Sequence, residues 1–96
     1  MKSIFNYGKK VLSSGVWKRA EDDVEFMRFV EHSFSAHTNG LWGDLPIDDR
    51  IANEEAIKSG EGIILSSWVK HNDNTRILII TDADRRYTTV MFPDER

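Results

Sequence analysis

The chain has 96 residues, of which 40% are hydrophobic and 30% are charged, and its formal net charge at pH 7 is -3. This length suits one domain, residues 1–96, with a single small core and the composition of an ordinary soluble globular protein. The sequence has no apolar run near the roughly eighteen residues that a membrane span needs, and the absence of cysteine excludes disulfides, thiolate chemistry and cysteine-ligated zinc.

The sequence also has no charged start followed by a long apolar segment and a cleavage site, so we expect a cytoplasmic location. The charges are unevenly distributed. Residues 1–19 hold five basic side chains and no acid, residues 20–62 hold eleven acids and three basic side chains, and residues 63–96 are balanced. Either these charges simply keep the surface solvated, or the acidic middle docks on a basic partner or imitates nucleic acid to it.

The first eighteen residues have no strong pattern. Residues 3–10 fit either a short helix broken at Gly8 or a loose arm. Residues 11–18 have strand-like ends around a central glycine, which predicts a fourth strand or an irregular extended piece. The basic pair Lys18-Arg19 that follows is not interleaved with aromatic residues, and with a sequence pI of about 5.5 we do not expect a nucleic-acid partner.

The strongest helix signal begins with the acids at 21–23 and ends at Asn39-Gly40. Its apolar stripe, spaced as in a helix, consists of Val24, Met27, Val30 and Phe34, widened by Phe26 and Phe29. His37 continues this stripe. It is therefore either a partly buried histidine bonded to a neighbouring group or a functional residue.

A loop with two glycines follows at residues 38–45, and its Trp42 is either a plug that closes the core or a contact for a partner. A second helix is predicted from Asp44 or Leu45 to Ser59, with Pro46 in its first turn and Gly60 at its end.

The second helix mixes its polar and apolar residues. Ile47, Ile51 and Ile57 share one arc with Arg50, Glu54 and Lys58, while Ala52 and Ala56 lie opposite. Either the isoleucine arc packs inward while the long charged side chains extend to solvent, which is the commoner arrangement, or the alanine side packs and leaves isoleucines exposed for a partner.

Three strand patterns make up the C-terminal third. Residues 62–70 and 87–92 alternate, and the aliphatic run 77–80 predicts a central strand that needs cover on both faces. Polar links at 71–75 and 81–85 predict hairpin turns. The expected fold is α+β, with a three- to four-stranded antiparallel sheet covered on one face by two helices.

Two sequence blocks resemble a known group of proteins. The first runs from His37 to Leu45 (HxxGxWGDL), and the second from Ile80 to Thr89 (ITxADRxxTT). Together they resemble an uncharacterised family of small proteins from bacterial plasmids, prophages and other mobile elements. Arg86 stands where the family has a small residue, and Arg96 where it has a tyrosine. The resemblance implies a mobile-element accessory protein, with counter-defence or regulatory roles by association.

From these features we expect a non-catalytic protein without cofactor or metal, monomeric or homodimeric, that contacts a host protein or complex and inhibits a host defence (CRISPR-like) assembly. The alternative is a small metal-dependent or general acid/base hydrolase that uses His37, Asp44 and Asp84. The candidate binding residues are His37, Trp42, Asp44, Asp48, Asp49, Glu54, Asp84 and Arg85.

Overall fold

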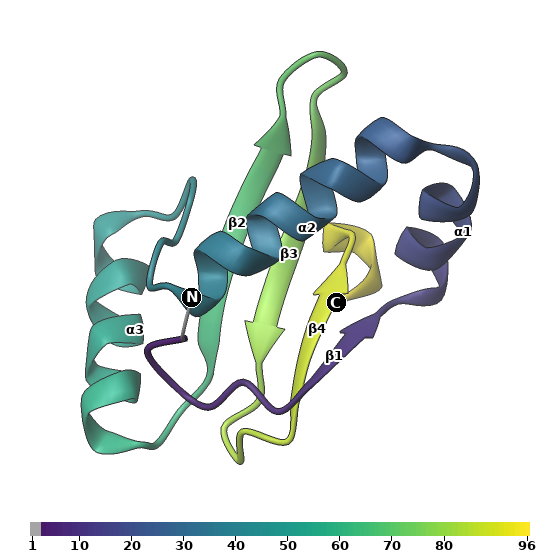
Figure 1. Ribbon diagram of the computed structural model, residues 1–96. Helices are drawn as coiled ribbons and strands as arrows, with labels where there is room; N and C mark the ends of the chain where they lie inside the picture. The colour runs from purple at the N-terminus through teal and green to yellow at the C-terminus, as the bar shows by residue number, and fades with distance from the viewer. Residues whose placement is uncertain (1–2) are drawn as a thin grey trace.

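Four strands form one sheet in the order β1-β4-β3-β2, and three α-helices and one short 3-10 helix surround it (Figure 1). These elements come from a computed structural model that describes residues 3–96. In chain order they are β1 (Lys9–Leu12), α1 (Ser14–Asp22), α2 (Val24–Thr38), α3 (Ile47–Ser59), β2 (Ile64–Lys70), β3 (Thr75–Thr81), β4 (Tyr87–Met91) and η1 (Pro93–Glu95). The predicted α+β class is confirmed.

The meander β2-β3-β4 is antiparallel, as predicted, with β3 between its two neighbours. The fourth strand is also present, but β1 pairs with β4 in parallel, so the sheet is mixed rather than wholly antiparallel. All three helices and two strands lie between β1 and β4 in sequence, and a connection of this length permits parallel pairing.

The segment after β1 is a helix where the sequence suggested an extended piece. Ser13 caps α1, because its side chain accepts a hydrogen bond from the Val16 N–H at 3.2 Å. Val16 is fully buried in the core. Residues 3–8 form no helix, so the arm interpretation was the right one, although the arm is attached to the end of α2 by the hydrogen bond from Ile4 N–H to Thr38 C=O.

Helix α2 lies across one face of the sheet and supplies three of the seven buried residues of the main core cluster. Phe26, Val30 and Phe34 are buried against Ile77, Ile79 and Val90 of β3 and β4. Asp23 caps the helix through the Phe26 N–H. The helix therefore begins later than predicted, and Val24, expected in the buried stripe, is 67% exposed.

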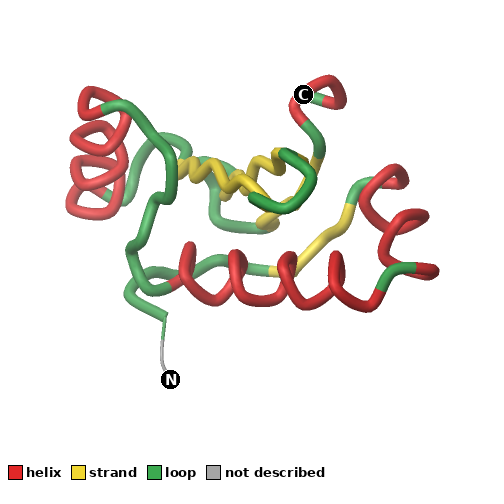
Figure 2. Tube along the Cα trace, turned by 90° about the horizontal axis from the view of Figure 1, so that it is seen from above, coloured by secondary structure: helices red, strands yellow, loops and turns green. Residues whose placement is uncertain are grey.

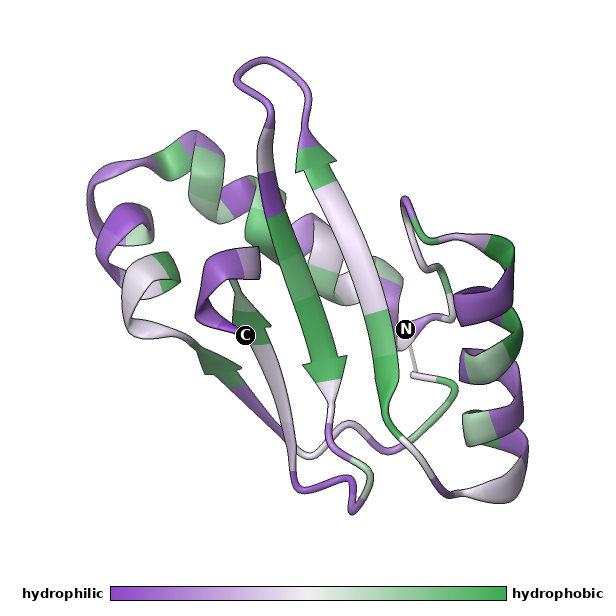
Figure 3. Ribbon diagram, turned by 180° about the vertical axis from the view of Figure 1, so that it is seen from behind, coloured by the Kyte–Doolittle hydropathy of each residue, from purple (hydrophilic) through white to green (hydrophobic). Residues whose placement is uncertain are grey.

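Among residues 3–96, the opposite face of the sheet carries no α-helix, and only the short η1 contacts β3 there. Figure 2 shows α2 on one side of the strands only, and Figure 3 looks directly at the other side. Leu78 and Ile80 point to that side and are only partly buried. The expectation that the run 77–80 is covered on both faces was wrong for this face. The expectation that two helices cover the other face was correct for α2 but wrong for α3, which lies beside the outer edge of β2.

None of the helices in residues 3–96 combines the length and the apolar content that crossing a bilayer requires.

Candidate functional site

Helix α3 faces the sheet with the side that carries the small residues Asn53 and Ala56. Asn53 and Ala56 are buried, whereas Ile47 is 66% exposed and Ile51 is 51% exposed. Ile57 is partly buried and packs against the cluster of Trp42, Leu45, Ala56 and Ile64, whereas Ala52 is exposed. The preferred interpretation of this helix, with its isoleucines packed inward, was therefore wrong for Ile47 and Ile51, and the alternative with exposed isoleucines is correct for these two. The cause is Asn53, whose side chain donates to the Leu65 C=O at 2.6 Å and accepts from the Leu65 N–H at 2.9 Å. These two bonds hold the narrow side of the helix against the edge of β2.

Carboxylates surround the exposed isoleucines. Asp48, Asp49, Glu54 and Glu55 are all exposed, and within residues 3–96 none of them has a basic group within 4.0 Å. Asp48 and Asp49 also lie in the first turn of α3, where negative charge complements the helix dipole. We call the set Ile47, Asp48, Asp49, Ile51, Glu54 and Glu55 the α3 surface.

Arg50, which the sequence places among the isoleucines, does not neutralise the α3 surface. Its guanidinium donates to the Leu45 C=O at 2.8 Å and to the Gly43 C=O at 3.4 Å, and so holds the loop that precedes the helix. Lys58 is also exposed on α3, so the helix has two exposed basic side chains against four exposed acids. The α3 surface is consequently both apolar and strongly acidic.

Trp42 is buried and closes the end of the core, as the plug interpretation predicted. Its ring packs edge-on against His37 with ring centroids 5.8 Å apart, and Phe5 from the N-terminal arm packs against both rings. The backbone around it pairs with β2, since Ser67 N–H donates to the Trp42 C=O and Asp44 N–H donates to the Ser67 C=O.

Gly43 makes this pairing possible. Its φ is 64°, and a Cβ there would lie 2.1 Å from the Ser67 carbonyl oxygen, so no other residue fits without moving the loop. Asp44 forms an ion pair with Arg76 at 2.9 Å. It does not cap α3, whose N-cap is Pro46, with no side-chain hydrogen bond.

His37 is completely buried at the end of α2 and belongs to a chain of hydrogen bonds. Its Nδ1 lies 2.7 Å from Ser66 Oγ and its Nε2 lies 2.9 Å from Thr81 Oγ1. Beyond these, Trp68 Nε1–H donates to Ser66 Oγ, Thr81 Oγ1 lies 2.7 Å from Thr88 Oγ1, and Thr88 Oγ1–H donates to the Tyr7 C=O.

This chain of bonds has one consistent direction. Because the Thr88 hydroxyl proton goes to the Tyr7 C=O, Thr88 accepts from Thr81, and Thr81 in turn accepts from His37 Nε2–H. Nδ1 of His37 is then an acceptor for the Ser66 hydroxyl, which itself accepts from the Trp68 indole. His37 is neutral in this arrangement, and burial lowers its pKa to about 4.

The burial of His37 and its hydrogen-bond partners show that it is a structural residue in the interior of the fold. Both ring nitrogens are bonded to hydroxyl groups of the sheet, and no carboxylate is among the partners. In addition, Phe5 and Trp42 lie against the ring. A general base must reach a substrate proton directly or through one water, and the buried ring has no such access.

Asp84 and Arg85 lie in the turn between β3 and β4, but they do not pair with each other. The carboxylate of Asp84 is near the Arg86 guanidinium at 3.6 Å. Arg85 donates to the Gly62 C=O at 2.7 Å and to the Ala56 C=O at 3.0 Å, besides two carbonyls of its own turn. Arg85 thus joins this turn to the C-terminal end of α3, where a cation also complements the helix dipole.

The three residues of the hydrolase hypothesis therefore have separate surroundings. His37 is in the interior, Asp44 pairs with Arg76 from β3, and Asp84 is exposed in a turn. Within residues 3–96, no group of three or more His, Cys, Asp or Glu side chains is arranged to hold a metal ion.

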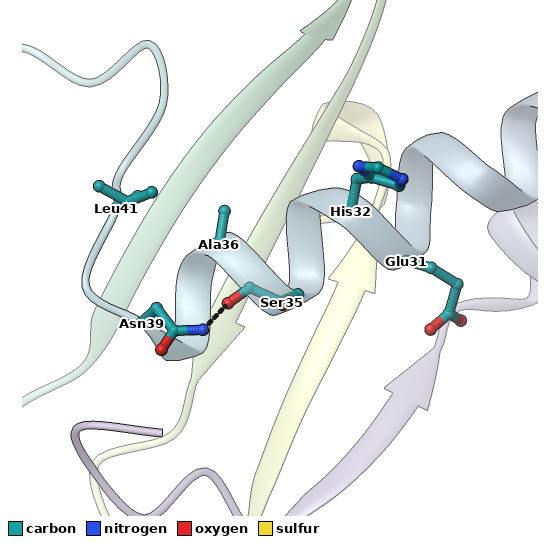
Figure 4. A pocket seen from close by; sticks show the side chains of 6 residues that line it. All are labelled: Glu31, His32, Ser35, Ala36, Asn39 and Leu41. Carbon is teal, nitrogen blue, oxygen red and sulfur yellow. Dashed lines mark hydrogen bonds between the residues drawn. The ribbon is translucent and has the colours of Figure 1, made fainter. Parts of the chain in front are cut away.

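A surface depression without any of these residues lies along the outer side of α2 (Figure 4). It is lined by Glu31, His32, Ser35, Ala36, Asn39 and Leu41. Figure 4 shows the Asn39 amide directed to the Ser35 carbonyl, a bond of 2.8 Å, and the Glu31 carboxylate pairs with Lys10. The depression is open and contains no residue predicted as a site.

Comparison of the chain with known protein families, with curated proteins and with solved structures finds no match. The resemblance to plasmid and prophage proteins stays an expectation that rests on its two sequence blocks. In the structure the two blocks meet, because His37 and Trp42 from the first block contact each other and His37 bonds Thr81 from the second.

Sequence reasoning missed one residue that positions the site and one that joins distant parts of the fold. Asn53 was given no contact, although an amide beside small residues on a helix is a signal for an inward hydrogen bond. Glu95 was assigned no contact, yet its carboxylate accepts from Ser13 and Gly15 at the start of α1. No local pattern could have indicated a contact between the two ends of the chain.

Proposed function

We propose that the protein is a mobile-element accessory protein that binds a host protein complex in the cytoplasm through the α3 surface, and that it inhibits a defence complex of the CRISPR-like kind. The supporting observation is the pair of exposed isoleucines, Ile47 and Ile51, surrounded by carboxylates that have no basic partner in residues 3–96. Large apolar side chains gain free energy when a partner covers them, at roughly 1.5–3 kcal/mol each.

The chemistry of the α3 surface supports one kind of partner. Several unneutralised carboxylates on one helix favour a positively charged partner, and they raise the association rate by long-range attraction. The two isoleucines require an apolar pocket within that positive surface. A groove that normally holds nucleic acid has the positive charge, so an inhibitor with an acidic helix competes for it.

The hydrolase alternative has no observation in its favour. Its histidine is buried among hydroxyl groups, and its two carboxylates lie in separate environments. Calorimetric titration with Mg²⁺, Mn²⁺ and Zn²⁺ tests its metal-dependent form directly, because a binding heat would reopen it.

A survival assay tests the proposed function. Cells with an active defence system are challenged with phage or plasmid while they express the wild type, Ile47→Ser/Ile51→Ser, or a control, Val24→Ser, which changes an equally exposed residue on α2. We expect the wild type and the control to raise survival, and the α3 variant to lose about tenfold or more of that effect.

Purified defence complex provides the second arm of this test. The wild type should be retained by the complex, and the charge variant Asp48→Asn/Glu54→Gln/Glu55→Gln should be retained less, with the difference shrinking at high salt. Unchanged survival together with no capture of any defence component would overturn the proposal.

A further inference from the structure

The uncovered side of the sheet is largely apolar. Alternation along the strands places its side chains opposite to the buried Ile77, Ile79 and Val90. We call the apolar members of this side the open sheet face: Val11 of β1, Tyr87 and Met91 of β4, Leu78 and Ile80 of β3, and Leu65 and Val69 of β2. The same register places four polar residues on this side, namely Lys9, Ser67, Thr89 and Arg76, the last of which pairs with Asp44. None of its members is fully buried, and Tyr87 is 44% exposed.

No α-helix among the described residues packs over the open sheet face. Helix α2 is on the other side and α3 contacts the β2 edge, whereas the short helix η1 lies on this side and contacts β3, so it covers one part of the face (Figures 2 and 3). A contiguous apolar surface of this kind on a small domain is typical of an interface.

The two edges of the sheet differ in charge. The edge at β2 is flanked by α3, whose four exposed acids outnumber its exposed basic side chains, Arg50 and Lys58. The edge at β1 carries Lys9, which is exposed and has no acid within 4.0 Å in residues 3–96. Arg86 lies beside it, since Lys9 N–H donates to the Arg86 C=O, but its guanidinium pairs with Asp84.

This difference in charge between the two edges favours a second copy of the chain as the partner that covers the open sheet face. When two identical sheets stack face to face about a two-fold axis parallel to the strands, the left edge of one lies over the right edge of the other. The basic β1 edge of each copy then meets the acidic α3 edge of its partner. A sheet pair stacked in this way is an ordinary β-sandwich packing.

We propose that two copies of the chain form a symmetric dimer through the open sheet face, with α3 of each copy beside β1 of the other. A face four strands wide and about six residues long covers roughly 400 Å², whereas a standard interface buries about 800 Å² from each partner. The apolar face alone is therefore too small, and the charged edges must take part. The dimer is expected to dissociate in the micromolar range.

Sedimentation velocity over a concentration series tests the dimer. The wild type should change from monomer to dimer, and Leu78→Thr should raise the dissociation constant about tenfold or more while it keeps the strand propensity of this position. Val24→Thr, an exposed apolar residue on the helical side, should leave the dissociation constant unchanged. Circular dichroism and melting of each variant establish that it is folded.

The orientation of the two copies is tested by two charge reversals of equal size. Lys9→Glu should weaken the dimer about threefold or more because it faces α3 of the other copy, and Arg28→Glu on α2 should not. A wild type that stays monomeric to about 0.5 mM, or Leu78→Thr with undiminished dimerisation, would overturn the proposal. A response to Arg28→Glu equal to that to Lys9→Glu would overturn the arrangement about the axis.

Discussion

The single direction of the hydrogen bonds around His37 explains why a histidine occupies the end of the buried stripe of α2. The ring must accept at Nδ1 from Ser66 and donate at Nε2 to Thr81, and only neutral imidazole does both. Serine and threonine at the ends of three strands then complete the chain with Trp68 and Tyr7. Within residues 3–96 no buried side-chain polar atom lacks a partner.

The same arrangement predicts how stability depends on pH. The pKa of His37 is lowered to about 4 from 6.5 by burial, so between these values the unfolded chain binds a proton that the folded chain does not. Stability therefore falls as pH falls through this window. We expect the free energy of unfolding to drop by about 2 kcal/mol between pH 7 and pH 5.

Urea unfolding of the wild type and of His37→Gln at both pH values measures this effect. The variant should be less stable at pH 7 but should lose much less on acidification, because glutamine does not titrate. Asp73, whose pKa is lowered to about 2 mainly by hydrogen bonds from Thr75, acts only below this range. Equal losses in the two proteins would show that His37 does not control the pH dependence.

At the scale of elements, the backbone groups at the outer edge of β2 are hydrogen-bonded by two different segments. The Asn53 side chain occupies both polar groups of Leu65, and the backbone of residues 42–44 occupies those of Ser67. An uncovered strand edge is a template for association with another chain, so this closure leaves the sheet faces, rather than this edge, for contacts.

Replacement of Asn53 should both destabilise the domain and open this edge. Asn53→Ala leaves the N–H and C=O of Leu65 without partners, and we expect a cost of about 1–3 kcal/mol in the free energy of unfolding. Glu55→Ala on the exposed side of the same helix should change it by less than about 0.5 kcal/mol. Chemical denaturation measures both, and an equal effect of the two substitutions would contradict the role given to Asn53.

The elements that the sequence predicted well are those with repeated local signals. The three strands of the meander, the end of α3 at Gly60, and the burial of His37 and Trp42 follow from alternation, a left-handed helix end and helical spacing. One error occurred where a distant contact decides, because Ile47 and Ile51 are exposed on a helix that Asn53 bonds to β2. Another error concerned a local signal, since Ser13 caps α1 three residues before Val16.

The functional residues were less predictable than the fold, for the same reason. Asp44 and Arg85 were grouped with the candidate site residues, but both hold the fold together. Asp44 pairs with Arg76, which lies 32 residues away. Arg85 donates to two carbonyl groups of its own turn and to those of Gly62 and Ala56, which lie 23 and 29 residues away. The acids of α3 were found correctly as exposed because they need no partner. Contacts between residues that are far apart in the sequence can be recognised only once the pairing of the strands is known.

At the scale of the whole molecule, the C-terminal end is joined to the start of α1 by a single carboxylate. One oxygen of Glu95 accepts from the Ser13 hydroxyl at 2.6 Å and from the Phe92 N–H at 2.8 Å, and the other accepts from the Gly15 N–H at 3.1 Å. A Cβ at Gly15 would lie 2.5 Å from this carboxylate, so the glycine makes room for it. Negative charge here also complements the dipole of α1.

This contact yields a prediction with a distinct pH range. The hydrogen bond from Ser13, followed by those from Phe92 and Gly15, lowers the pKa of Glu95 below its ordinary 4.5, although partial desolvation opposes the shift. The stabilisation is thus present above pH 4.5 and is lost as pH falls below it.

We expect Glu95→Gln to cost about 1 kcal/mol in the free energy of unfolding at pH 7, which lowers the melting temperature by about 4–8 °C. The neighbouring Asp94→Asn, at an exposed acid without such bonds in residues 3–96, should leave it unchanged. Thermal melting at pH 7 and pH 3 measures the effect, and the gap between the wild type and Glu95→Gln should narrow in acid. A gap of the same size at both pH values would mean that Glu95 contributes through packing rather than through its charge.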